Sequence, residues 1–295
     1  MAEENLIFQP PKLLPPGGDS FELPGMTRLL NGVFLALLLL LLRPAGNLSA
    51  VEIIAHRGAS ADAPENTLAA MQLAWAQQAD AIELDLWLSK DGRLVVFHDA
   101  DTKRFEGTPR KISGLTWEET QQLDVGAWKA PGFKDTRIPS LDSILATIPA
   151  GHRAVLEIKC GPEIVPELAR VLRAAQCPPQ QIVLISFNFE ALRESKRMFP
   201  KMEHYFLHDY KKQSPGGQYP ALAPLIIRVK EAGFEGLNLN YNWPIDKNFV
   251  SEVKAAGLKL FVWTVDDAAV ARRLTEAGVD GLTTNKPQWL RTQLK

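Results

Sequence analysis

The chain has 295 residues, of which 46% are hydrophobic and 23% are charged, and its formal net charge is -1. This composition excludes a disordered or fibrous protein, and the length is sufficient to bury a large core in one or two domains. Because the chain carries no excess of positive charge, nucleic acid is not expected as a partner.

The first 50 residues differ from the rest of the chain. Residues 1–25 are rich in proline and have no periodic apolar pattern. From Met26 the chain has the pattern of a secretory signal peptide, with the basic Arg28, an uninterrupted apolar stretch of 10 residues from Val33 to Leu42, and small residues up to Ala50. The apolar stretch is short compared with the roughly 20 residues that span a bilayer.

We therefore predict that the signal segment starts at Met26, that it is removed, and that the exported protein begins near Val51. The alternative is an uncleaved segment that anchors the protein. Membrane contact is expected only through this segment.

From Val51 onward, short apolar runs alternate with segments of helical length. PENTLAAMQLAWAQQ predicts a helix with Pro64 at its start, and TWEE at Thr116 to Glu119 predicts a capping box that opens another helix. This alternation over residues 51–295 predicts an α/β fold, a (β/α)8 barrel, with a doubly wound sheet as the alternative. The apolar runs have the length and composition of buried strands, and they are VEIIA, AIELDLWL, LVVF, AVLEI, IVLISF, HYFL, GLNLN, LKLFVWTV and GLTTN.

Nine runs are one too many for an eight-stranded barrel, and a local feature explains the excess. The SKDGR segment between the second and third runs is too short for a parallel crossover, and its Asp91-Gly92 pair is typical of a hairpin turn. We therefore predict a β-hairpin between the second and third strands. Its return strand brings His98 level with Leu84, between two carboxylates of the neighbouring strand.

Those carboxylates share one face of their strand. Side chains alternate along a strand, so Glu83 and Asp85 point to the same side, as do Glu157 and Lys159 of LEIKC. Charged groups inside a barrel are costly unless they are paired or bind a metal. Three carboxylates of this kind predict one divalent cation, Mg2+ or Ca2+, because both prefer oxygen ligands. The alternative is a buried cluster of salt bridges.

The motifs together resemble one known family. HRGASADAPENT, ELDLWLSKDGRLVVFHD, RIPSLDSIL, LEIK, ISF and VWTV follow, in order and spacing, the pattern of the glycerophosphodiester phosphodiesterases, from about Ile53 to Pro287. The resemblance implies a distorted TIM barrel, related to the phosphatidylinositol-specific phospholipase C type, that hydrolyses glycerophosphodiesters to glycerol 3-phosphate and an alcohol. It implies two catalytic histidines, three metal-binding carboxylates and two phosphate-contacting cations, which fall on His56 and His98, on Glu83, Asp85 and Glu157, and on Arg57 and Lys159.

These residue types suit the chemistry of a phosphodiester. An arginine such as Arg57 can fork two phosphate oxygens, and two histidines can transfer protons on both sides of phosphorus. Two further residues have weaker interpretations: Trp263 either lines the site or belongs to the core, and Asn66 either orients the metal ligands or starts a helix.

Two other functions stay open at this point. The same barrel could act on a lysophospholipid or a phosphoinositide, or the protein could be an exported binder of phosphorylated polyols. The expected partner is a small-molecule glycerophosphodiester, and no obligate protein partner is evident.

Overall fold

The computed structural model describes residues 51–212 and 217–295. The predicted tail and signal segment lie outside these residues, so export and the anchored alternative stay predictions. Within the described residues, no helix is both long enough and apolar enough to cross a membrane.

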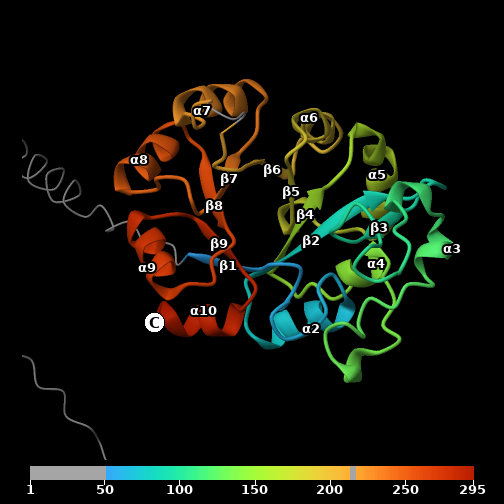
Figure 1. The fold of residues 1–295 in the computed structure, drawn as a ribbon. Helices are drawn as coiled ribbons and strands as arrows, with labels where there is room; N and C mark the ends of the chain where they lie inside the picture. The colour runs from blue at the N-terminus through green and yellow to red at the C-terminus, as the bar shows by residue number, and fades with distance from the viewer. Residues whose placement is uncertain (1–50, 213–216) are drawn as a thin grey trace, which may run out of the picture. The chain divides into compact units, whose positions relative to one another are not determined.

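The strands of the described chain close into a barrel, seen nearly end-on in Figure 1. Closure follows from the first strand, which pairs in parallel with both the second strand and the last one. The eight parallel strands are β1 (Glu52–Ala55), β2 (Ala81–Leu88), β4 (Arg153–Ile158), β5 (Ile182–Ser186), β6 (Glu203–His208), β7 (Gly236–Asn240), β8 (Lys259–Trp263) and β9 (Gly281–Thr284). The predicted TIM barrel is confirmed, and the doubly wound alternative is wrong.

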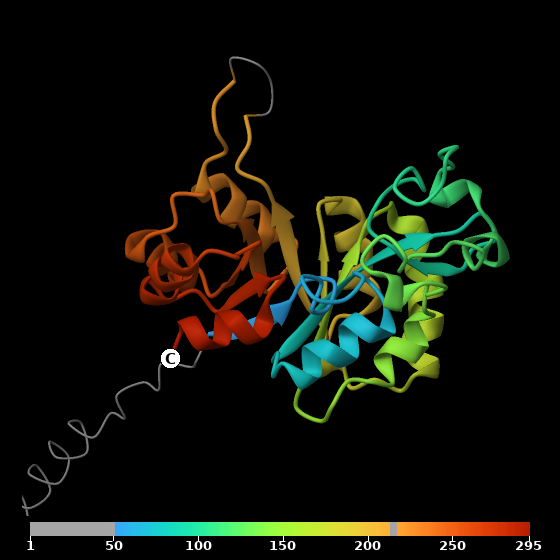
Figure 2. The ribbon, with the colours of Figure 1, turned by 60° about the horizontal axis from the view of Figure 1, so that its bottom comes forward.

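Helices surround the barrel and connect successive strands (Figures 1 and 2). Figure 2 shows the last helix beside the first strand, so the two ends of the described chain meet where the barrel closes. The α-helices are α2 (Leu68–Ala76), α3 (Trp117–Thr120), α4 (Leu141–Leu145), α5 (Val165–Ala174), α6 (Phe189–Met198), α7 (Leu222–Glu231), α8 (Lys247–Ala255), α9 (Ala268–Ala277) and α10 (Pro287–Gln293). Short 3-10 helices are η1 (Ile112–Gly114), η2 (Pro131–Phe133), η3 (Pro162–Ile164) and η4 (Pro179–Gln181).

The predicted hairpin is present and has the predicted register. Strand β3 (Leu94–Val96) runs antiparallel to β2, with Leu86 opposite Val96. The backbone N–H of Phe97 then donates to the carbonyl of Asp85 at 3.1 Å. Continuing this register by one residue places His98 beside Leu84, in the middle of β2 between Glu83 and Asp85.

The first helix starts later than its sequence indicates. Pro64 was the expected first residue, but α2 begins at Leu68 and the Thr67 side chain accepts the N-cap hydrogen bond from Ala70. Asn66 has a left-handed φ of 59°, which a helix excludes. The predicted capping box at Thr116 to Glu119 is confirmed, with both of its reciprocal hydrogen bonds.

The barrel interior is filled in layers. Its middle is a separate apolar cluster that includes Ile54, Val155, Tyr205 and Phe261. Below it, at the amino ends of the strands, an ionic cluster closes the barrel; its members are Glu52, Arg153, Glu203 and Lys259, and Arg153 pairs with both glutamates. Above the apolar layer, alternate positions on β2 and β4 place the predicted site residues at the end of the barrel that lies opposite the ionic cluster.

Gly58 fits tightly between the end of β1 and helix α2. Its φ is +80°, and a Cβ at this position would lie 2.6 Å from the backbone carbon of Ala70. Gly92 at the hairpin turn has a similar φ of +76°, but a Cβ there would meet nothing within 4 Å. A substitution at Gly92 therefore costs only the strain of a left-handed backbone, whereas one at Gly58 also costs the steric clash of the new Cβ with Ala70.

Replacing Gly58 with Ala should lower the free energy of unfolding by about 3 kcal/mol or more, because left-handed strain and overpacking add. Gly92→Ala is the matched control and should cost only about 1–2 kcal/mol. Urea unfolding of both variants measures the difference, and equal losses would contradict the close packing of α2 against Gly58.

Candidate functional site

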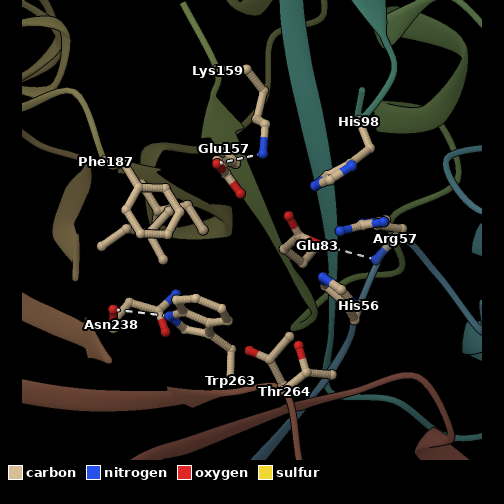
Figure 3. A pocket seen from close by; sticks show the side chains of 13 residues that line it. His56, Arg57, Glu83, His98, Glu157, Lys159, Phe187, Asn238, Trp263 and Thr264 are labelled. Carbon is tan, nitrogen blue, oxygen red and sulfur yellow. Dashed lines mark hydrogen bonds and ion pairs between the residues drawn. The ribbon is translucent and has the colours of Figure 1, made fainter. Parts of the chain in front are cut away.

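A cavity of about 110 Å3 opens at the carboxyl ends of the barrel strands (Figure 3). Carboxyl ends of parallel strands meet at one face of a TIM barrel, so residues far apart in the sequence converge there. One side of the cavity is charged, with His56, Arg57, Glu83, His98, Glu157 and Lys159. The other side is largely apolar, with Ile185, Phe187, Leu207 and Trp263.

The three predicted metal ligands come together. Glu83, Asp85 and Glu157 are buried, and one oxygen from each lies within 4.8 Å of the others. Asp85 and Glu157 are direct neighbours in the parallel pairing of β2 with β4. The alternation of side chains along both strands therefore places the three carboxylates on the interior surface of the barrel.

Two cations neutralise this cluster only in part. The Nε atom of Arg57 lies 3.3 Å from Asp85, and the Nζ atom of Lys159 lies 2.9 Å from Glu157 and 3.4 Å from Asp85. The backbone N–H of Arg57 donates to Glu83 at 2.9 Å. Three buried carboxylates thus share two cationic side chains.

The imbalance changes the pKa of each carboxyl group. Burial, followed by the charges of Asp85 and Glu157, raises the pKa of Glu83 well above its usual range. Burial and the charge of Asp85 raise the pKa of Glu157 to about 7. Burial also opposes ionisation of Asp85, but Arg57 and Lys159 hold its pKa below the usual value.

The donor set fits a hard divalent cation. All three groups offer carboxylate oxygens, the ligands that Mg2+ and Ca2+ prefer. The Oδ1 atom of Asp85 is buried and forms no hydrogen bond within the described residues, and its charge partner there is the Lys159 ammonium at 3.4 Å. A buried carboxylate oxygen held by one long ion pair has room for a further positive partner, and a cation at this point would supply it.

Both predicted histidines extend into the cavity from the strand ends. His56 directly follows β1, and its Nδ1 lies 2.7 Å from Oδ1 of Asn285. His98 follows β3, and its Nδ1 lies 2.8 Å from Oδ1 of Asp99. Burial and the charge of Arg57 lower the pKa of His56 to about 4. Burial also lowers the pKa of His98, against the opposing effect of Asp85.

Arg57 is held by a carboxylate that sequence analysis did not single out. Its Nη1 donates to Oε1 of Glu65 at 3.2 Å, and the same oxygen accepts from Arg104 at 2.6 Å. Arg104 also contacts Asp99, the partner of His98, at 2.9 Å. Glu65 stands inside the PENT motif, but its partner Arg104 is 39 residues away and nothing local indicates the contact.

Trp263 and Asn66, for which the sequence left two interpretations each, lie in different positions relative to the cavity. Trp263 lines the cavity, and its Nε1–H donates to the carbonyl of Asn238 at 3.2 Å. Asn66 lies behind the carboxylates: its Nδ2 donates to Asp85 at 2.8 Å, and its Oδ1 accepts from the Asp85 backbone at 3.2 Å. Asn66 therefore orients Asp85; it does not line the cavity that Trp263 lines, and the cap of α2 is Thr67.

Comparison with known proteins gives one consistent result. A model of the glycerophosphoryl diester phosphodiesterase family matches residues 56–289. The chain is 31% identical to a putative glycerophosphodiester phosphodiesterase of Bacillus subtilis over 81% of this chain and 96% of the relative. It is 33% identical to a glycerophosphodiester phosphodiesterase of Caldanaerobacter subterraneus over 81% of this chain and 95% of the relative.

A solved structure supports the same comparison. A phosphodiesterase of Oleispira antarctica, in complex with the product sn-glycerol-3-phosphate, superposes with a TM-score of 0.74 at 29% identity. The superposition covers 82% of this chain and 96% of that one.

The raised pKa of Glu157 makes the cation-free protein less stable as the pH rises. An unfolded glutamate ionises near pH 4.5, whereas Glu157 in the folded protein ionises near 7. The folded state therefore loses stability between these two values, and the full penalty remains at higher pH. Glu157→Gln should stabilise the chelated protein at about pH 8, on the order of 1–3 kcal/mol, and the gain should vanish toward pH 4.5.

Urea unfolding in excess chelator, measured at several pH values, tests this expectation. Glu190→Gln removes an exposed glutamate that pairs with Arg193 and is the matched control, with an expected change within about 0.5 kcal/mol at any pH. A Glu157→Gln protein that is less stable than the wild type at high pH would show that this carboxylate is not under electrostatic stress.

Proposed function

We propose, from the premise that this chain belongs to the glycerophosphoryl diester phosphodiesterase family, that it hydrolyses glycerophosphodiesters to glycerol 3-phosphate and an alcohol. The family makes the chain a phosphoric diester hydrolase. The observation that carries the substrate and mechanism is the convergence of His56, His98 and Arg57 with three buried carboxylates around one cavity.

Positive charge binds the phosphate in this proposal. Arg57 and Lys159 line the cavity beside the carboxylate cluster and can each contact phosphate oxygens. Glu83, Asp85 and Glu157 would hold one divalent cation, Mg2+ or Ca2+. Bound there, the cation supplies further charge against the phosphoryl oxygens. Substrate phosphate would also give the guanidinium of Arg57 an anionic partner besides Glu65 and Asp85.

The two histidines then transfer protons on opposite sides of phosphorus. His98 bonds to the Asp99 carboxylate, which favours the protonated ring and opposes the lowering of its pKa by burial, so we assign His98 as the acid that protonates the departing alkoxide. His56 bonds to a neutral amide and is the base that accepts a proton from the attacking oxygen. The low pKa of His56 keeps its ring neutral and able to accept that proton.

The apolar side of the cavity favours a second candidate, hydrolysis of a lysophospholipid or phosphoinositide by the same barrel. Phe187 is 47% exposed and packs edge-on against Trp263 with ring centroids 5.6 Å apart. An exposed aromatic at the mouth could contact an acyl chain. A role as an exported phospho-polyol binder has no comparable support, because a binder needs neither histidine.

The test of substrate is direct. The full chain is incubated with glycerophosphocholine, glycerophosphoethanolamine, glycerophosphoglycerol and lysophosphatidylcholine, with Mg2+ or Ca2+, and the products are assayed. Release of glycerol 3-phosphate from the first three supports the proposal. Turnover of lysophosphatidylcholine alone supports the second candidate.

Removal of the cation should abolish activity and lower thermal stability together. Without it, the carboxylates repel one another, and the binding free energy that favours the folded state is lost. Melting temperature and turnover are measured in chelator and after adding back Mg2+ or Ca2+. Glu83→Gln should weaken the response to cation, whereas Glu190→Gln should not. Full activity after exhaustive chelation would contradict the proposal that a divalent cation bound by these carboxylates is needed for turnover.

Replacing either His56 or His98 with Ala should lower kcat by about 100-fold or more, with a much smaller change in KM. A nitrophenyl phosphodiester has a good leaving group and needs no acid, so it should restore activity to His98→Ala but not to His56→Ala. His152→Ala, at the amino end of β4, is the control and should keep wild-type turnover. If both site variants keep near wild-type kcat on glycerophosphodiesters, the two-histidine mechanism is wrong.

A further inference from the structure

Behind His56 lies a polar chain that the mechanism above does not use. Its first member is Asn285, which directly follows strand β9 and meets Nδ1 of His56 at 2.7 Å. Its second member is Asp266, which follows β8 and accepts from Nδ2 of Asn285. Asp266 also accepts from the Asn285 backbone at 2.9 Å and from the Thr284 hydroxyl at 2.7 Å.

The direction of the Asn285 amide follows from this arrangement. A carboxylate can only accept hydrogen bonds, so the amide nitrogen of Asn285 must face Asp266. The amide oxygen then faces His56, where it also accepts from the Ser60 hydroxyl at 2.8 Å. The backbone and hydroxyl donors on Asp266 hold the carboxylate in place from the other side.

The amide direction decides which nitrogen of His56 carries the proton. An amide oxygen can only accept, so the hydrogen bond forms when Nδ1 of His56 is protonated. In the neutral ring, Nε2 then bears the lone pair. This is the tautomer that a base needs, provided that Nε2 faces the substrate.

We propose that Asp266 and Asn285 are positioning residues that hold neutral His56 in the Nδ1–H tautomer, so that Nε2 is free to accept the proton of the attacking oxygen. The inference rests on the proposed role of His56 as the base and adds what prepares it for that role. Asp266 acts through Asn285 and touches neither His56 nor the cavity.

Asp266→Asn tests the proposal because it changes the hydrogen-bond pattern and leaves the shape nearly unchanged. The new amide oxygen must still accept from the backbone of Asn285 and from Thr284, so its amino group faces Asn285. Two amino groups cannot face each other, so the Asn285 amide turns over. Its nitrogen then donates to Nδ1 of His56, and the ring proton moves to Nε2.

The first measurement does not depend on activity. In the full chain labelled with 15N in its five histidines, long-range 1H–15N correlations at about pH 8 distinguish the two neutral tautomers, and His56→Gln identifies the resonance of His56. We expect the Nδ1–H form in the wild type and the Nε2–H form in Asp266→Asn. The second measurement is turnover of glycerophosphocholine, where kcat should fall about tenfold to 100-fold and KM should stay within about threefold.

Two further variants complete the design. Asp267→Asn changes the next residue, whose carboxylate only caps helix α9, and asparagine caps equally well, so tautomer and kcat should match the wild type. The double variant Asp266→Asn with Asn285→Asp exchanges the amide and the carboxylate. Every donor again meets an acceptor, so the Nδ1–H tautomer should return. Because a carboxylate now contacts the ring directly and favours its protonated form, the tautomer and not kcat is the readout of this variant.

A wild-type His56 in the Nε2–H form, or an Asp266→Asn protein that keeps both the wild-type tautomer and kcat, overturns the proposal. So does a double variant in which the Nδ1–H tautomer is not restored. Failure of the proposed function has a different signature, because a wild type that hydrolyses no glycerophosphodiester would still show the tautomers as stated.

Discussion

Three buried carboxylates that share two cationic side chains are the constraint on which the rest of this site depends. The barrel strands hold Glu83, Asp85 and Glu157 together, and the backbone N–H of Arg57 donates to Glu83 while the amide of Asn66 donates to Asp85. Burial, followed by repulsion from the neighbouring carboxylates, raises the pKa of two of the three groups. The deficit of positive charge makes the site attractive to a cation, since an added positive charge relieves the repulsion that folding has imposed.

The excess of buried negative charge is confined to one end of the barrel. The opposite end has its own charged groups, but there Arg153 and Lys259 balance Glu52 and Glu203, and no carboxylate is left over. Between the two ends, the interior cluster that includes Tyr205 and Phe261 excludes water and holds the strands in register. The charge-balanced layer at the amino ends and the apolar layer in the middle therefore support the layer at the carboxyl ends, where negative charge is in excess. The proposed chemistry takes place in that last layer.

Much of this arrangement could be predicted because it depends on strand geometry alone. Alternation along β2 and β4 puts the three carboxylates on one surface, and the Asp91-Gly92 turn sets the register that brings His98 to them. The contacts that could not be predicted are set by distant partners. Asn66 takes a left-handed backbone, and α2 starts after it, because its amide bonds Asp85, 19 residues away. Asn285 could be identified only as the end of a strand, since its contact with His56 spans 229 residues.

In the proposed mechanism two chemically identical histidines perform opposite steps, and only the residues around them can distinguish them. His98 is bonded to a carboxylate, and a negative charge stabilises the imidazolium that an acid must be before it gives up its proton. His56 is bonded to an amide that carries no charge and favours protonation less than a carboxylate does, and burial and the charge of Arg57 keep the pKa of the ring low, at about 4. The carboxylate of Asp266 stands one residue further back, where it orders the amide but does not touch the ring. In the proposed mechanism, acid and base therefore differ in the distance of a carboxylate from the imidazole: direct contact for His98, and one intervening amide for His56.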